Sequence, residues 1–101
     1  MQQIDHSVTS VDELRSYVHH TLCERESLLA EQFRTQEQPL LSRGTLCGLQ
    51  FTLRGPRAIK LGAIWAAEQN VLFFYDTRGE RYLRVNLVER FAIPELLAEA
   101  G

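Results

Sequence analysis

From Gly44 onward, apolar residues recur at every second position in four successive segments, and this alternation constrains the fold more than any other feature of the chain. A spacing of two is typical of a β-strand with one buried face, because successive side chains of a strand point to opposite sides. The four apolar sets are Leu49, Phe51 and Leu53; Ile59, Leu61, Ala63 and Trp65; Val71, Phe73 and Tyr75; and Leu83, Val85 and Leu87. We expect each set to face the core.

The connections between these segments are short. Arg54 to Arg57 and Glu68 to Asn70 have the length of turns, and Asp76 to Gly79 suits a type I turn completed by a glycine. Parallel neighbours need a crossover of about a dozen residues or more, which these connections do not provide. The sequence therefore predicts a four-stranded antiparallel meander.

An amphipathic helix is predicted before the strands, from about Val11 to about Thr35. Ser10 and Glu13 have the spacing of a capping box, in which each side chain accepts a backbone hydrogen bond at the helix start. Helical spacing places one group of apolar residues in a single stripe: Val11, Leu14, Val18, Leu22, Leu29 and Phe33, flanked by Tyr17 and Leu28. Pro39 and the polar residues before it are expected to end the helix.

Together these elements predict an α+β fold in one domain, residues 1–101, with the long helix packed on one face of the sheet. A chain of this length has room for a single core. We expect residues 1–9 to be flexible. A short final helix is predicted from Pro94 to Gly101, because the fixed φ of proline suits the first helical position.

The composition and the cysteines bear on the compartment. No stretch reaches the roughly 20 apolar residues of a membrane span, and the N-terminus has no basic patch followed by an apolar run. Cys23 and Cys47 are too few for a disulfide-stapled scaffold and lack the paired short spacing of a zinc site. We therefore expect a cytoplasmic protein with no membrane partner and no disulfide.

The functional hypothesis depends on the second face of the sheet, which is formed by the residues between the apolar positions of each strand. It is neither polar nor apolar throughout, and four of its members are too apolar for a solvated face: Ile64, Leu72, Phe74 and Tyr82. A large exposed apolar patch usually marks an interaction site. The final helix, a second copy of the chain, or another partner or ligand could each cover this face.

From this face we predict a small non-enzymatic protein-interaction module, either a homodimer or an adaptor subunit of a larger assembly. The predicted interface consists of Ile64, Leu72, Phe74, Tyr82, Lys60 and Arg84. A small-ligand pocket between the helix and the sheet is a third possibility, which would need a gap in the core.

The charge distribution supports a second hypothesis. The net charge is only −2, but residues 1–38 carry seven acids and three bases, whereas residues 43–90 carry eight bases and four acids. A basic surface with aromatic side chains can neutralise phosphates and stack bases. The alternative function is therefore single-stranded nucleic-acid binding, by Arg54, Lys60, Phe74, Tyr82 and Arg84.

The predicted helix also carries polar residues that could perform chemistry. His19, Cys23 and Glu26 share one helix face and are possible metal ligands, but no fourth ligand is evident, and the same residues suit a solvated face. Cys23 and His19 could be nucleophile and base, yet oxyanion donors and a third orienting group are lacking, so no catalytic residue, metal or cofactor is predicted.

Arg25 falls inside the apolar stripe, where it either extends to the rim of the sheet or pairs with a specific acceptor.

Overall fold

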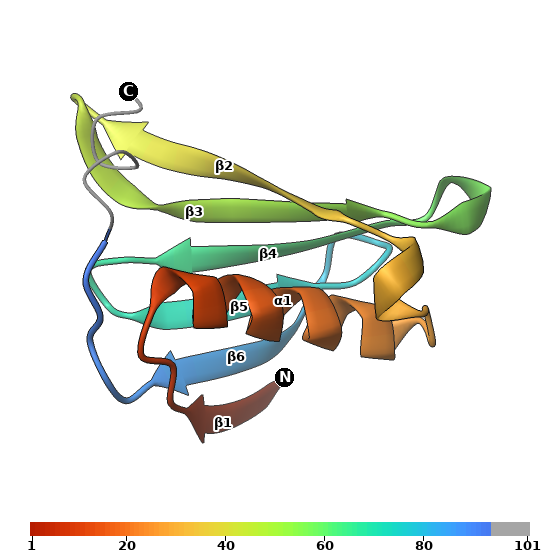
Figure 1. Ribbon diagram of the computed structural model, residues 1–101, viewed down its shortest axis with the longest axis horizontal. Helices are drawn as coiled ribbons and strands as arrows, with labels where there is room; N and C mark the ends of the chain where they lie inside the picture. Colours follow the sequence, from red (N-terminus) through yellow and green to blue (C-terminus); the bar gives the residue numbers. More distant parts are fainter. Residues whose placement is uncertain (94–101) are drawn as a thin grey trace.

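One helix and a six-stranded mixed sheet make up the fold of the computed structural model, which describes residues 1–93, and this confirms the α+β class (Figure 1). The elements are β1 (Gln2–His6), α1 (Val11–Arg25), the 3-10 turn η1 (Ala30–Gln32), β2 (Thr35–Ser42), β3 (Thr45–Arg54), the 3-10 turn η2 (Pro56–Ala58), β4 (Lys60–Ala66), β5 (Val71–Tyr75) and β6 (Arg81–Leu87). The strand order is β1-β6-β5-β4-β3-β2. The predicted meander of β3 to β6 is present, but the prediction of only four strands was wrong.

Helix α1 begins where the sequence predicts and ends about ten residues earlier. The Ser10 hydroxyl accepts from the Glu13 N–H over 3.1 Å, and the Glu13 carboxylate accepts from the Thr9 N–H over 2.7 Å. That bond lowers the pKa of Glu13. At the other end Ser27 has a φ of 55°, so the chain turns out of the helix. Leu29 and Phe33, assigned to the apolar stripe, lie beyond this turn and outside α1.

Strand β2 occupies the segment that was expected to end the helix. It pairs with β3 through a tight turn at Arg43 and Gly44, whose φ angles are 53° and 79°. Positive φ at both central residues matches the twist of a β-hairpin. Pro39 is accommodated because β2 is an edge strand, where a missing N–H disrupts no second ladder. The polar segment before Pro39 is therefore a strand.

Strand β1 lies at the opposite edge of the sheet and pairs with β6 in parallel. Residues 1–9 were expected to be flexible, and the structure instead orders residues 2–6 as a strand. Ile4 packs against the core, and the Val88 N–H donates to the His6 carbonyl over 3.0 Å. The sequence gives little indication of this strand, because only one of its side chains is apolar and directed inward.

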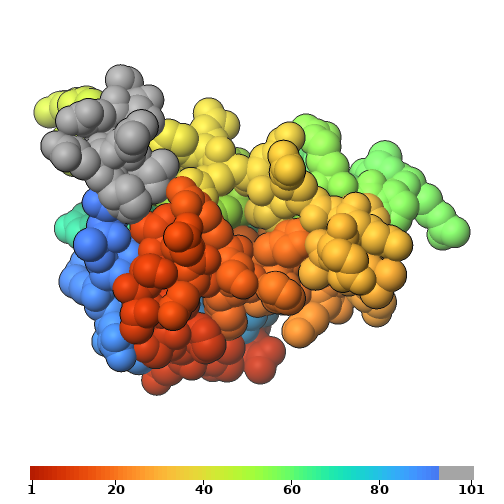
Figure 2. All heavy atoms as spheres, viewed as in Figure 1, coloured from red at the N-terminus to blue at the C-terminus, as the bar shows by residue number. Residues whose placement is uncertain are grey.

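Helix α1 packs across one face of the sheet and closes the core (Figures 1 and 2). The helix contributes a row of buried side chains on its inner side: Val11, Leu14, Val18, Leu22 and Cys23. The sheet contributes Leu49, Phe51, Leu53, Leu61, Ala63, Trp65, Leu72, Phe74, Leu83, Val85 and Leu87. The face that these strands turn away from α1 is called the open face below.

In β5 the alternate residues that face the core are not the predicted ones. Leu72 and Phe74 are 0% exposed and belong to the core, whereas Phe73 and Tyr75 are only half-buried. The Phe74 ring meets the ring of Tyr17 on α1 edge to face, with 6.3 Å between centroids. Val71 to Tyr75 are all apolar or aromatic, so the sequence pattern does not determine which alternate set faces inward.

A β-bulge in β6 explains the position of Tyr82. Phe74 pairs with Leu83, but the next residue of β5, Tyr75, pairs with Arg81, so Tyr82 is the extra residue. The Tyr82 ring lies on the helix side, 6.3 Å from the ring of Phe74. Simple alternation along β6 puts Tyr82 on the same face as Arg84, and the bulge breaks that alternation.

The chain after β6 folds against the end of the sheet. Phe91 stacks on Trp65 with 5.2 Å between ring centroids, and Arg90 donates to the carbonyl oxygens of Ala67 and Glu68. The helix predicted from Pro94 lies outside the described residues. Within residues 1–93, no helix is long and apolar enough to cross a membrane.

Candidate functional site

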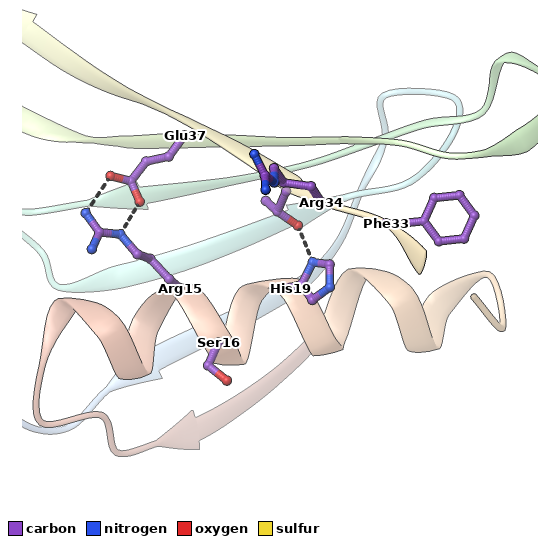
Figure 3. A pocket seen from close by; sticks show the side chains of 7 residues that line it. Arg15, Ser16, His19, Phe33, Arg34 and Glu37 are labelled. Carbon is purple, nitrogen blue, oxygen red and sulfur yellow. Dashed lines mark hydrogen bonds and ion pairs between the residues drawn. The ribbon is translucent and has the colours of Figure 1, made fainter. Parts of the chain in front are cut away.

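A hollow of about 500 Å³ lies on the helix side, between α1 and β2 (Figure 3). Its lining comes from α1 and from the segment that leads into β2: Arg15, Ser16, His19, Phe33, Arg34, Thr35 and Glu37. Most of its polar groups already have partners. The hydrogen bonds and ion pairs in this hollow therefore attach the helix to the edge of the sheet.

Two side chains of α1 make these attachments. Arg15 donates to both carboxylate oxygens of Glu37, over 2.6 and 3.0 Å, and to Asp12 over 2.9 Å. The Glu37 carboxylate raises the pKa of Arg15. His19 uses both ring nitrogens, with Nδ1 at 2.7 Å from the Thr35 hydroxyl and Nε2 at 2.8 Å from the Ala30 carbonyl. Neither side chain is free to bind a ligand.

The side chains considered as possible metal ligands on α1 are His19, Cys23 and Glu26, and Cys23 and His19 were also considered as nucleophile and base. The Cys23 sulfur lies 3.8 Å from Nε2 of His19, but it is only 2% exposed, and burial raises the pKa of the thiol. Among residues 1–93, no three His, Cys, Asp or Glu side chains come together in a way that could hold a metal ion. Cys23 and Cys47 are both free thiols, and Cys47 is exposed.

Arg25 extends from the apolar stripe to the rim of the sheet. Its side chain is exposed, and its guanidinium carbon lies 4.1 Å from the centroid of the Tyr82 ring. Burial raises the pKa of the Tyr82 phenol, and the charge of Arg25 acts in the opposite direction. Of the two interpretations from the sequence, the structure supports extension to the rim, with an aromatic ring as the contact.

The open face is formed by the outward side chains of β3 to β6. One continuous cross-strand row runs from Gln50 on β3 through Ile64 on β4 and Phe73 on β5 to Arg84 on β6. The next row along the strands runs from Thr52 through Gly62 and Tyr75 to Arg81. This face therefore has a half-buried apolar and aromatic strip, made by Ile64, Phe73 and Tyr75, with arginines on one side of it.

The structure divides the predicted interface residues between the two faces. Ile64, Lys60 and Arg84 lie on the open face, and so does Arg54 of the nucleic-acid hypothesis. Leu72, Phe74 and Tyr82 lie on the helix side, so their predicted placement on the open face was wrong.

Three residues of the open face were missed in the sequence analysis: Phe73, Tyr75 and Arg81. The aromatic pair could have been found from the fact that β5 is apolar in both phases, which makes either set a candidate for the surface. Arg81 was missed because nothing in the local sequence of β6 indicates the bulge that brings it onto this face.

The charged side chains that β3, β4 and β6 turn to the open face are all basic, whereas at the edge of this face Asp5 of β1 lies beside Asn86 and accepts a hydrogen bond from its side chain over 3.0 Å. Arg54, Lys60, Arg81 and Arg84 project from β3, β4 and β6, and the outward positions of β3 to β6 hold no carboxylate. Within residues 1–93, the side-chain ion pairs are the two made by Arg15 on the helix side. The four cations of the open face thus have no acidic partner in the described part of the chain.

The two arginines of β6 are held beside Phe73. The guanidinium carbon of Arg81 lies 3.8 Å from the Phe73 ring centroid, and that of Arg84 lies 5.7 Å from it. Arg81 also donates to the Tyr75 hydroxyl over 2.8 Å, and Arg84 donates to the Asn86 side chain over 3.1 Å. These contacts restrict both side chains, and within residues 1–93 neither arginine forms an ion pair, although Asn86 links Arg84 to the Asp5 carboxylate.

A shallow groove of about 530 Å³ crosses the open face next to these arginines. Gly62, Ile64 and Tyr75 line it together with Lys60, and the β5–β6 turn, residues 76–79, forms one wall. The absence of a side chain at Gly62 leaves room here, since the nearest atom to a Cβ added at this position is the Phe51 carbonyl oxygen at 3.4 Å.

Within residues 1–93, the fold and this surface define an α+β domain in which a helix covers one sheet face and the other face is basic, partly apolar and not covered by a described element. Comparisons with protein-family models, curated protein sequences and solved structures give no match. The function of the protein must therefore be inferred from its own open face.

Proposed function

We propose that this protein is a cytosolic, non-enzymatic interaction module that binds another protein through the open face of its sheet. The observation that carries the proposal is the combination of a half-buried strip, Ile64, Phe73 and Tyr75, with four basic side chains that have no acidic partner among residues 1–93. Protein interfaces typically have an apolar and aromatic centre with charged groups at the rim.

The adaptor form of this proposal is better supported than the homodimer form. A two-fold dimer made by the open faces would place the same patch on both sides of the interface. Arg81, Arg84 and Lys60 would then face a second set of cations, and like charges brought together across an interface are unfavourable. A partner with a different surface avoids this repulsion.

The residues that could perform chemistry support a non-enzymatic role. Cys23 is buried beneath the helix with a raised pKa, and both ring nitrogens of His19 are engaged in hydrogen bonds. A nucleophile needs an accessible thiolate and a base that can accept its proton. Neither condition is met at this pair.

Single-stranded nucleic-acid binding is the second candidate for the same face. It is supported by Arg54, Lys60 and Arg84, which lie on the open face as this hypothesis requires. The aromatic residues of the hypothesis, Phe74 and Tyr82, lie on the helix side, so Phe73 and Tyr75 would have to take their place.

Site-specific photo-crosslinking in the cells that express the protein tests the proposal. A benzophenone amino acid replaces Ile64 on the open face, and the matched control places it at Val88, which is 61% exposed and follows β6. We expect position 64 to give a discrete, protease-sensitive and nuclease-resistant band that position 88 does not give.

Three other outcomes contradict the adaptor form. A band at twice the mass of the 11.6 kDa chain from position 64 indicates a homodimer. Nuclease-sensitive adducts indicate the nucleic-acid candidate. The same products from both positions, or none from position 64, mean that the open face is not an interaction surface.

A further inference from the structure

We infer that the partner presents an acidic polypeptide segment whose carboxylates bind the Arg81 and Arg84 pair and whose neighbouring apolar side chain enters the groove over Gly62. This inference rests on the proposed function and specifies the chemistry of the partner. It depends on three features of the open face: the bulge in β6, the free donors of the two arginines, and the groove beside them.

The bulge brings the two arginines onto one face. Residues three positions apart in a regular strand point to opposite sides of the sheet. Because Tyr82 is the extra residue, Arg81 pairs with Tyr75 while Leu83 pairs with Phe74, and both Arg81 and Arg84 come to lie against Phe73. Bulges frequently redirect side chains in this way next to functional sites.

The arginines have donors to spare for a ligand. A guanidinium carries five N–H groups in a planar fork that matches a carboxylate. Within the described part of the chain, Arg81 makes one side-chain hydrogen bond, to Tyr75, and Arg84 makes one, to Asn86. Since contacts with Phe73 restrict both side chains, less conformational entropy is lost when a carboxylate binds them.

The groove supplies the apolar half of the recognition. Gly62, Ile64 and Tyr75 lie in it, and Tyr75 is the residue to which Arg81 donates. A carboxylate on the arginines therefore places the adjacent part of the same ligand over Gly62. Lys60 also lines the groove, as do Asp76 and Arg78 of the β5–β6 turn. Lys60 pairs with Arg54 across β3 and β4, which gives a second cationic site for a ligand with several acids.

The same geometry favours a polypeptide over a nucleic acid. Binding of single strands depends on aromatic rings whose faces are free to stack with bases. Here the guanidinium of Arg81 lies over the Phe73 ring at 3.8 Å and over the Tyr75 ring at 5.5 Å. The ring faces are thus already engaged, and the exposed recognition groups are guanidinium donors beside an apolar groove.

Fluorescence anisotropy with defined probes tests this inference on the purified full chain. The first probe is a twelve-residue peptide with four glutamates around a central leucine. The second is the same peptide with glutamine for glutamate, and the third is a twelve-nucleotide oligothymidylate. We expect the glutamate peptide to bind at low salt at least about tenfold more tightly than either of the other two.

Matched variants identify the binding site. Arg81→Glu and Arg84→Glu are expected to weaken binding of the glutamate peptide about tenfold or more, whereas Arg34→Glu, the same charge change at an exposed helix-side residue, changes it less than about twofold. Gly62→Val fills the groove without altering charge. The wild type is expected to bind the glutamate peptide with a central leucine more tightly than the same peptide with a central glycine, and Gly62→Val is expected to remove this preference. If the reversed charge of Arg81→Glu disturbs the fold, Arg81→Gln is used in its place.

Each remaining outcome is informative. Tighter binding of the oligothymidylate, lost in Arg84→Glu, would overturn the inference in favour of nucleic acid. An equal loss in Arg34→Glu, or no difference between the glutamate and glutamine peptides, would show that the arginine pair is not a carboxylate site. If the crosslink from position 64 to a protein persists in the Arg81→Glu, Arg84→Glu double variant, the proposed function stands and only this inference fails.

Discussion

Phe73 and Phe74 are adjacent in the sequence and lie on opposite faces of the sheet. Phe74 is fully buried beneath α1, whereas Phe73 is half-buried on the open face and has Arg81 over its ring at 3.8 Å. One of these rings therefore belongs to the core, and the other belongs to the candidate interaction surface.

This separation predicts opposite effects of two similar substitutions. Phe74→Ala should lower the free energy of unfolding by about 3 to 5 kcal/mol, because it removes a fully buried ring and leaves a cavity. Phe73→Ala should lower it by about 1 kcal/mol or less and should weaken binding at the open face. Urea unfolding measures both values, and a larger loss in Phe73→Ala than in Phe74→Ala would contradict the assigned phase of β5.

Asn70 is a buried polar residue, and its side chain joins three parts of the chain. It accepts from the Trp65 indole N–H over 3.0 Å and donates to the carbonyl oxygens of Leu87 and Glu89 over 3.1 and 2.7 Å. Its φ is 54°, a conformation that asparagine and glycine tolerate better than other residues.

We expect Asn70→Gly to cost about 2 to 3 kcal/mol of stability, because buried hydrogen-bonding groups lose their partner. Asn70→Ala should cost about 1 kcal/mol more, since alanine also strains the backbone at positive φ. Thermal unfolding followed by Trp65 fluorescence measures both. Equal stability of the wild type and Asn70→Gly would show that the side-chain bonds contribute nothing.

The fold could be predicted from the sequence where apolar residues alternate clearly with polar or small ones. In β3 and β4 the residues between the apolar positions are mostly polar or small, as in Leu49 to Leu53, and the predicted faces are confirmed. The N-terminal cap at Ser10 is also confirmed, because it depends only on neighbouring residues. These features are determined by local sequence.

The remainder of the fold depends on tertiary contacts. Strand β1 exists because β6 offers it a parallel partner, and β2 exists because residues 35–42 pair with β3 despite their polar composition and Pro39. Ser27 ends α1 although apolar residues continue at helical spacing beyond it. For the site, Ile64, Lys60 and Arg84 were placed correctly, whereas the reversed phase of β5 and the bulge at Tyr82 were not evident from the pattern.

Replacing Arg25 tests its position at the rim. Because its side chain is exposed, Arg25→Leu should change the unfolding free energy by less than about 1 kcal/mol. The charge of Arg25 lowers the pKa of Tyr82 while burial raises it, so removing this charge should raise the Tyr82 pKa further.

The sign of the associated pH effect follows from the neutral phenol being the buried form. The stability contributed by burying neutral Tyr82 is present below the ordinary tyrosine pKa and is lost as the pH rises through the raised value. An ultraviolet titration, compared with the same titration of Tyr82→Phe, isolates this group. A Tyr82 pKa that falls in Arg25→Leu would contradict the observed contact.

The two thiols should differ in reactivity. Cys47 is exposed, whereas Cys23 is buried and burial raises the pKa of its thiol. We expect Ellman's reagent at pH 8 to modify one thiol in a fast phase and the other in a phase at least about a hundredfold slower, limited by opening of the structure. Cys47→Ser should abolish the fast phase and Cys23→Ser the slow one. Similar rates for both thiols would mean that the helix does not protect Cys23.

Hydroxyl-radical footprinting tests whether the open face is the binding surface. The oxidation of Phe73 and Tyr75 is measured in the purified protein and again after the protein is mixed with extract from the cells that express it. Phe33, in the helix-side hollow, is the internal reference. We predict that the extract protects Phe73 and Tyr75 at least about threefold and leaves Phe33 unchanged. Unchanged oxidation of Phe73 and Tyr75, with protection at Phe33, would show that the open face is not the binding surface and would assign binding to the opposite face.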